Sequence, residues 1–176
     1  MKTIRLTTII AAPAERVFQL STSVNLHLDS ARHTHETVID GRTAGELRKG
    51  ETVTWRGRHF GWMFTHKSLI EELRPHSYFR DAMVEGAFRS FVHEHHFAPF
   101  NDGTRMRDIV RFAAPFGPAG RLAERLLLER HLVRFLRRRN AMLKQIAESP
   151  EAWQHYLQSG SRLQEPRKHV LNQAAI

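Results

Sequence analysis

Two histidines separated by a single residue, His93 and His95, lie in the run from Phe91 to Phe97, whose alternation is typical of a β-strand. Side chains two residues apart on a strand point to the same face, so both imidazoles share one side of a sheet. A polar side chain on the inner face of a sheet is costly unless it has a partner. The pair therefore indicates either a hydrogen-bonded core network or the wall of a pocket that binds a molecule.

The candidate partners of these imidazoles are carboxylates on the strands before and after them. If residues 86–88 form a three-residue loop, Asp81 lies opposite His93 on the inner face, and Arg80 lies opposite Glu94 on the outer face. Opposite charges that face each other across two strands stabilise a register. We therefore expect an Asp81–His93 pair inside and an Arg80–Glu94 ion pair outside.

The next hairpin turns at Asn101-Asp-Gly103, a strong signal for a tight turn. A two-residue turn at Asp102-Gly103 gives the pairs Phe97–Asp108, His95–Val110, His93–Phe112 and, on the outer face, Glu94–Arg111. A three-residue turn would instead put His96 opposite Asp108. We prefer the first register because it pairs opposite charges outside and lets Asp108 reach His95 diagonally.

Three kinds of chemistry fit these residues. Two histidines with this spacing can share a metal, with Asp81 or Asp108 as a third ligand. The favoured interpretation is that each imidazole hydrogen-bonds a carboxylate or a backbone carbonyl, and we expect no metal or other cofactor. A histidine held by a carboxylate can also act as an acid or base, which makes His93, His95, Asp81 and Asp108 the catalytic candidates. The same geometry would orient the polar end of a bound ligand.

A ligand would contact the inward side chains of the expected sheet. The expected ligand-binding residues are Trp55, Trp62, Phe64, His66, Phe79, Met83, Phe91, His93, His95, Phe97, Met106, Asp108, Val110 and Phe112.

The order of elements indicates one α+β domain. A strand over residues 2–10 is followed by two short helices, near residues 13–21 and 24–29. Six more strands are expected, over residues 33–40, 51–56, 62–73, 77–85, 89–100 and 104–112. Short connections favour antiparallel pairing, so we expect a curved antiparallel sheet of about seven strands.

One long helix is expected after the sheet, over residues 119–147, because apolar side chains recur there at three- and four-residue steps. Its stripe includes Leu122, Leu126, Leu136 and Leu143, and should lie against the sheet. We assign residues 1–147 to the domain and 148–176 to an extension, with a short helix to about residue 158 and a loose tail from Gly160.

Composition excludes several classes of protein. The 176 residues are 41% hydrophobic and include no cysteine, so disulfides and thiolate metal sites are excluded. No apolar run is long enough to span a bilayer, the first residues predict a strand rather than a signal peptide, and a cytoplasmic location is expected.

The formal net charge of +9 raises the question of an anionic partner. The basic residues are interspersed and no aromatic stacking platform lies among them, so we expect a solvated surface and no nucleic acid. Arg137-Arg-Arg139 cannot share one face of a helix, although with Arg130, Arg134 and Lys144 they could form a basic ridge that meets an anionic membrane transiently.

Four short motifs connect these features to a known family. They are Gly86-x-Phe88, His93-x-His95-x-Phe97, Thr104-x-Met106-x-Asp108 and Pro115-Phe-Gly117, and Trp55 and His59-Phe-Gly61 agree with them. With the order of elements, residues 1 to about 147 resemble the helix-grip superfamily (SRPBCC), which includes START lipid-transfer domains, the major birch-pollen allergen and polyketide cyclases. The motifs are most similar to those of a bacterial subgroup, and the residues of that subgroup's pattern have no assigned chemical role.

The resemblance implies a mainly apolar cavity between the sheet and the long helix. Members bind lipids, sterols, polyketides or plant hormones, and some are enzymes. We expect this chain to bind a small hydrophobic or amphipathic ligand that is lipid-like or polyketide-like. The alternatives are a cofactor-free cyclase or dehydratase that uses a cavity histidine as acid or base, and a protein-interaction or membrane-surface module that uses the basic helix.

Overall fold

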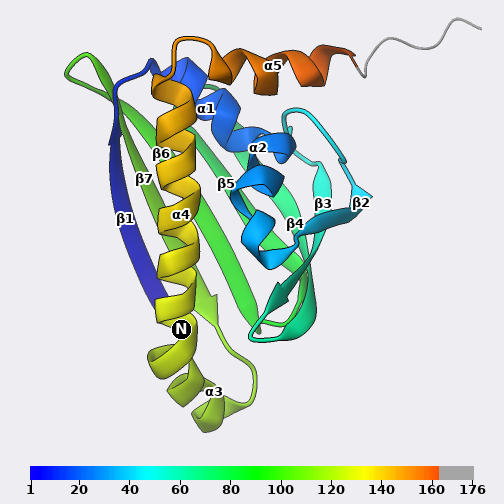
Figure 1. Ribbon diagram of the computed structural model, residues 1–176. Helices are drawn as coiled ribbons and strands as arrows, with labels where there is room; N and C mark the ends of the chain where they lie inside the picture. The colour runs from blue at the N-terminus through cyan, green and yellow to red at the C-terminus, as the bar shows by residue number, and fades with distance from the viewer. Residues whose placement is uncertain (163–176) are drawn as a thin grey trace, which may run out of the picture.

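A computed structural model describes residues 1–162 of the chain. Within this range the strands form one antiparallel sheet in the order β1-β7-β6-β5-β4-β3-β2, which curves around the helices (Figure 1). The strands are β1 (Lys2–Ile10), β2 (Thr37–Gly41), β3 (Thr52–His59), β4 (Trp62–Arg74), β5 (Tyr78–Gly86), β6 (Ser90–Phe100) and β7 (Gly103–Ala113). The expected α+β class, with a curved antiparallel sheet and a long C-terminal helix, is confirmed.

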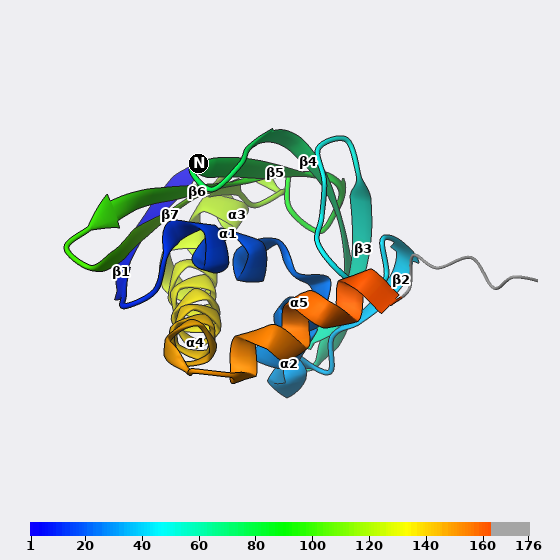
Figure 2. The ribbon, with the colours of Figure 1, turned by 90° about the horizontal axis from the view of Figure 1, so that it is seen from above.

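The helices lie on the concave side of the sheet. They are α1 (Ala14–Thr22), α2 (Val24–Ser30), the 3-10 helix η1 (Arg32–Thr34), α3 (Gly117–Ala123), the π-helical segment η2 (Glu124–Leu128), α4 (Glu129–Glu148) and α5 (Ala152–Arg162). Seen from above, α4 lies beside β1 and β7, while β3 and β4 curve away from it (Figure 2). This offset between the helix and the middle of the sheet determines where an internal space can exist.

Helix α2 has a side-chain cap at its start, and helix α1 has an apolar side that packs into the core. The hydroxyl of Ser23 accepts a hydrogen bond from the backbone N–H of Leu26 and so caps α2. The buried side of α1, which includes Val17, Phe18 and Leu20, packs into an apolar cluster with the C-terminal half of α4. Helices α1 and α2 thereby close one end of the concave face.

The apolar core divides into two main clusters under α4. The first contains Ile10, Phe18, Leu20, Phe79, Phe97, Met106 and Leu143, and the second contains Ile4, Val110, Phe112 and Leu136. The first cluster lies between α4, α1 and strands β1, β5, β6 and β7, and the second lies between α4 and strands β1 and β7. Burial of each of these side chains stabilises the fold by about 1.5–3 kcal/mol.

The helix expected over residues 119–147 is present, but its first third is not a regular α-helix. A π-helical segment, η2, separates α3 from α4 and rotates the apolar stripe relative to the rest of the helix. Leu122 and Leu126 are consequently 59% and 52% exposed, whereas Leu136 and Leu143 are buried as expected.

The register of β5 against β6 is the predicted one. Asp81 lies opposite His93, Arg80 lies opposite Glu94, and Phe79 lies opposite His95. The expected Arg80–Glu94 ion pair is wrong, because Glu94 pairs with Arg111 and Arg80 pairs with Glu71.

The register of β6 against β7 differs from the prediction by two residues. The turn consists of Asn101 and Asp102, and Phe100 pairs with Gly103. Asn101 adopts the left-handed conformation at φ 50°, and a side chain on Gly103 would collide with the Ile10 carbonyl of β1. His95 therefore lies opposite Asp108. A shift of two residues leaves every side chain on its predicted face.

Two smaller differences concern the ends of elements. The strand expected from His33 begins at Thr37, because Arg32–Thr34 form η1 and His35 is left-handed at φ 51°. The terminal helix continues to Arg162, and the loose tail expected from Gly160 falls, from residue 163 onward, outside the described residues. Among the described helices, none combines the length and the apolar character that crossing a membrane requires.

Candidate ligand-binding site

A pocket of about 330 Å³ lies between the sheet and α4. Its lining comes from β3, β4, β5 and β6 on one side and from α4 on the other, and the junction of α1 and α2 closes one end. Aromatic and aliphatic side chains form most of the wall, including Trp55, Phe79, Phe91, Leu132 and Phe135. The volume lies within the range of natural small-molecule sites, about 300–1,000 Å³.

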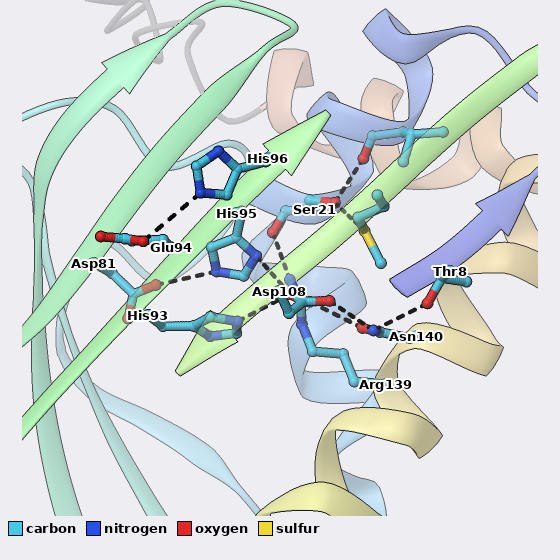
Figure 3. A network of polar contacts seen from close by, with 12 residues as sticks. Thr8, Ser21, Asp81, His93, Glu94, His95, His96, Asp108, Arg139 and Asn140 are labelled. Atoms are coloured by element: carbon cyan, nitrogen blue, oxygen red, sulfur yellow. Dashed lines mark hydrogen bonds and ion pairs between the residues drawn. The ribbon is translucent and has the colours of Figure 1, made fainter. Parts of the chain in front are cut away.

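One wall of this pocket carries the histidine pair and Asp81, and Asp108 lies next to the histidines (Figure 3). His93 and His95 extend from β6 with ring centroids 3.7 Å apart, and both are buried. The His95 ring also stacks on Phe79 at 3.9 Å, which defines its plane. Asp81, on the neighbouring strand, lines the same wall and keeps 16% of its side chain exposed.

Asp108 lies behind the two histidines and contacts both. Nε2 of His93 donates a hydrogen bond to its Oδ1 at 2.9 Å, and Nδ1 of His95 lies 3.0 Å from the same oxygen. Nε2 of His95 is 3.3 Å from Oδ1 of Asp81. The expected Asp81–His93 hydrogen bond is therefore replaced by a crossed arrangement, whereas the expected contact of Asp108 with His95 is present.

These contacts shift the pKa values of three groups. Burial acts to raise the pKa of Asp108, but the hydrogen bonds and charges of His93 and His95 outweigh it and hold that pKa well below its usual range. Burial likewise acts to raise the pKa of Asp81, and His95 and His93 lower it further than burial raises it. Burial, and then the nearby His95, lower the pKa of His93 although Asp108 acts to raise it. At neutral pH this wall carries two carboxylates beside a neutral His93 imidazole.

Helix α4 completes the network with two consecutive polar side chains. Asn140 donates to Oδ2 of Asp108 at 2.7 Å, and Arg139 donates to the backbone carbonyl of Ser21 at 3.1 Å. Arg139 lines the pocket and is buried, while Arg137 and Arg138 are exposed. The expectation that the arginine run forms only a solvated face is therefore wrong for Arg139.

A second polar group lies elsewhere in the pocket lining and was missed by the sequence analysis. Nε2 of His27 donates to Glu36 at 2.7 Å while its ring stacks on Trp55 at 4.1 Å. Nδ1 of His59 and Nε2 of His131 are 2.9 Å apart, and burial lowers the pKa of both imidazoles. These residues come from α2, β3, α4 and the η1–β2 connection, so only the tertiary fold brings them together.

The expected ligand-binding residues divide by position. Those that line the pocket are Trp55, Phe64, His66, Phe79, Phe91, His93 and His95. Phe97, Met106, Val110 and Phe112 are buried in the two core clusters, and Asp108 is buried behind the histidines. Met83 lies against Gly86 of its own strand, and Trp62 is 75% exposed on the β3–β4 hairpin. The offset position of α4 explains this division, because α4 covers the inner face of β7 and leaves that of β3 to β5 open.

The arrangement allows three kinds of chemistry. The histidines and Asp81 can donate and accept hydrogen bonds to the polar end of a ligand while the aromatic wall holds an apolar body. A His93 imidazole held by Asp108 can transfer a proton. Asp81, His93 and His95 each offer one atom to a possible metal ion, and these atoms lie within 4.8 Å of one another.

The model of a family described as polyketide cyclase / dehydrase and lipid transport matches residues 1–148. No curated protein matches the sequence.

Solved structures share the fold at low sequence identity. The Zhui aromatase/cyclase from Streptomyces sp. R1128 is 16% identical, with a TM-score of 0.68 over 84% of this chain and 93% of that chain. TTHA0849 from Thermus thermophilus is 18% identical, with a TM-score of 0.61 over 81% and 97%. The major latex-like protein 151 from Panax ginseng is 13% identical, with a TM-score of 0.60 over 84% and 98%.

Proposed function

We propose that this chain, which belongs to the polyketide cyclase / dehydrase and lipid transport family, binds a small hydrophobic or amphipathic molecule in the pocket between the sheet and α4. The ligand is lipid-like or polyketide-like, with an apolar body and at least one polar group. The observation that carries the proposal is a mainly apolar pocket of about 330 Å³ whose lining includes the buried histidine pair and the partly exposed carboxylate of Asp81.

The distribution of side chains supports an amphipathic ligand. Trp55, Phe79, Phe91 and Phe135 offer apolar surface to a ring or acyl chain. Burial of such surface supplies about 25 cal/mol for each Å² removed from water. A polar group of the ligand would lie against Asp81, whose partly exposed carboxylate accepts hydrogen bonds.

A titration with the neutral fluorescent probe N-phenyl-1-naphthylamine tests this function without involving the positive charge of the protein. We expect saturable binding of one probe per chain. Leu132→Trp, which places a larger side chain in the pocket from α4, should weaken binding by about tenfold or more. Ala141→Trp, on the exposed side of the same helix, is the matched control and should bind as the wild type does.

Thermal unfolding checks that each variant is folded, and Ala87→Trp, at an exposed edge of the pocket, is a second filling variant. Probe binding that is equally strong in the wild type and in both filling variants would contradict the proposal.

A second candidate function is acid–base catalysis on the same ligand, and the hydrogen bond between His93 and Asp108 favours it. A buried imidazole with a lowered pKa is neutral at physiological pH and can accept a proton. The reaction class would be a cyclisation or dehydration. In that case His93→Gln abolishes turnover of a polyketide-like substrate while the pocket still binds it, whereas a pure binding protein shows no turnover in either form.

A further inference from the structure

Three potential metal ligands meet on two paired strands of the pocket wall. Asp81 of β5 lies opposite His93 of β6, and His95 follows on the same face of β6. One atom from each residue lies within 4.8 Å of the other two. The three side chains come from strands rather than loops, so their backbone positions are determined by the sheet.

Asp108 contacts one ring nitrogen of each histidine. Nε2 of His93 is bound to its Oδ1 at 2.9 Å, and Nδ1 of His95 lies 3.0 Å from that oxygen. The nitrogens left over are Nδ1 of His93 and Nε2 of His95, and the latter is the one that lies 3.3 Å from Asp81. A carboxylate that holds the second nitrogen of each histidine is the usual companion of a metal-binding imidazole, because it orients the ring and determines the tautomer.

Both ring nitrogens of His95 face a carboxylate, Nε2 toward Asp81 at 3.3 Å and Nδ1 toward Asp108 at 3.0 Å. An imidazole with a single N–H can donate to only one of them, whereas an imidazolium, or a cation bound at one nitrogen, satisfies both. Nδ1 of His95 is buried, and its 3.0 Å contact with Oδ1 of Asp108 does not have the geometry of a hydrogen bond. A cation between Nε2 and Asp81 would leave the single proton on Nδ1, facing Asp108.

We propose that Asp81, His93 and His95 bind one divalent first-row transition-metal ion, with its open coordination positions directed into the pocket. Two imidazoles and one carboxylate favour ions such as Zn²⁺ or Co²⁺ over Mg²⁺ or Ca²⁺. Three protein ligands leave room for a water or a ligand oxygen, as in sites that act on a substrate. In such a site each ligand atom lies about 2.0–2.2 Å from the ion, so the three ligand atoms must lie close to one another. The 3.3 Å between Nε2 of His95 and Oδ1 of Asp81 already allows both atoms to bind one ion.

Asp108 acts in this proposal as a positioning residue, since it touches both histidines and not the ion. Asn140 holds its other oxygen at 2.7 Å. The sequence alone favoured a plain hydrogen-bonded network over a metal. The added observation is that Asp81 and Asp108 lie on opposite sides of the two imidazoles (Figure 3), and that Asp81 lines the pocket while Asp108 is fully buried.

Calorimetric titration of chelator-treated protein with Zn²⁺, repeated with Co²⁺ and its absorption spectrum, tests the site. We expect one ion per chain and loss of that stoichiometric binding in Asp81→Asn, His93→Gln and His95→Gln. Asp108→Asn should retain binding but weaken it about 10–100-fold. Imidazole NMR signals of His93 and His95 should shift on addition of Zn²⁺.

Two matched controls locate the ion. His96→Gln changes a histidine on the opposite face of the same strand, and should bind Zn²⁺ as the wild type does. His131→Gln removes the other close histidine pair of the pocket and should also leave binding unchanged. Circular dichroism of each metal-free variant establishes that it is folded. Failure of the folded wild type to bind either ion, binding that survives all three ligand substitutions, or loss of binding in His131→Gln would overturn the assignment.

The proposed metal site rests on the same pocket as the proposed ligand-binding function, and experiments can contradict either proposal without the other. Probe binding is therefore repeated in excess chelator. Metal-free protein that binds the probe but takes up no ion ends the metal assignment alone. Protein that binds Zn²⁺ at these residues but never the probe supports the metal site and ends the proposed function.

Discussion

Asn140 of α4 donates a hydrogen bond to Asp108 of β7 across 2.7 Å, and both side chains are buried. The same amide lies 3.3 Å from the hydroxyl of Thr8 on β1. Asp108 in turn receives a hydrogen bond from His93. The long helix is therefore joined to the polar wall of the pocket by a buried amide as well as by apolar packing.

Replacing this amide should destabilise the fold. Asn140→Leu keeps the size of the side chain but leaves one oxygen of Asp108 without its donor, which should cost about 1–3 kcal/mol of unfolding free energy. Urea denaturation measures the loss. Gln145→Leu, at an exposed position of the same helix, is the control and should change the unfolding free energy by less than about 0.5 kcal/mol. Equal effects of the two substitutions would contradict the role given to Asn140.

The buried arginine of α4 should matter more than its exposed neighbour. Arg139→Met removes the donor to the Ser21 carbonyl, and we expect a loss of about 1–3 kcal/mol. Arg138→Met removes the same charge from an exposed position, so the unfolding free energy should stay within about 0.5 kcal/mol of the wild-type value. Chemical denaturation of both proteins at one ionic strength makes the comparison, and a larger loss for Arg138→Met would refute it.

Glu36 should contribute a stability that disappears in acid. Burial acts to raise its pKa, but the charge and hydrogen bond of His27, with the charges of His59 and His66, leave it below its ordinary value of 4.5. Because the folded-state pKa is the lower one, the carboxylate stabilises the fold above pH 4.5, and this contribution is lost as the pH falls through the folded-state pKa. The difference in unfolding free energy between wild type and Glu36→Gln should therefore shrink below pH 4.5.

Urea denaturation over a series of acidic pH values measures that difference. Glu85→Gln, which changes an exposed carboxylate, should show no comparable trend. A Glu36→Gln difference that stays constant down to about pH 3 would argue against a depressed Glu36 pKa.

Tyr156 ties α5 to the rest of the domain. Burial, and then its hydrogen bond to Asp29 at 2.8 Å, raise the pKa of its phenol to about 12. A pKa raised by folding means that the phenol stabilises the fold below its ordinary value of 10.0, and that this contribution is lost as the pH rises through about 12. Burial also raises the pKa of Tyr78, so the diagnostic signal in an absorbance titration is the tyrosinate transition near pH 12, which should be absent in Tyr156→Phe and present in Tyr78→Phe. The removal of that transition by Tyr78→Phe instead would show that α5 is not anchored this way.

The faces of the central strands could be predicted from the sequence because alternation has a period of two. The β5–β6 pairing was predicted correctly, and the β6–β7 error of two residues left His93 and His95 on the inward face. The partner of each histidine could not be predicted, because it depends on which residue of the Asn101–Gly103 turn takes the left-handed conformation. Asn101 takes it, and that choice decides which residue of β7 faces His95.

The position of the pocket could not be predicted from strand alternation alone. Phe97, Met106, Val110 and Phe112 point inward as expected, yet α4 and α1 cover them. His27, Glu36, His59 and His131 enter the pocket lining from four separate segments, and no local pattern distinguishes them from surface histidines and carboxylates. Three-dimensional packing of α4 toward one edge of the sheet decides both outcomes.

Native mass spectrometry of freshly purified protein tests most directly whether the pocket binds a small molecule. We expect wild type and Ala141→Trp to carry an additional organic mass that is released on denaturation, and Leu132→Trp to carry none or much less. Wild-type ions at the bare mass alone, with no uptake after incubation with fatty acids or polycyclic phenols, would contradict the account.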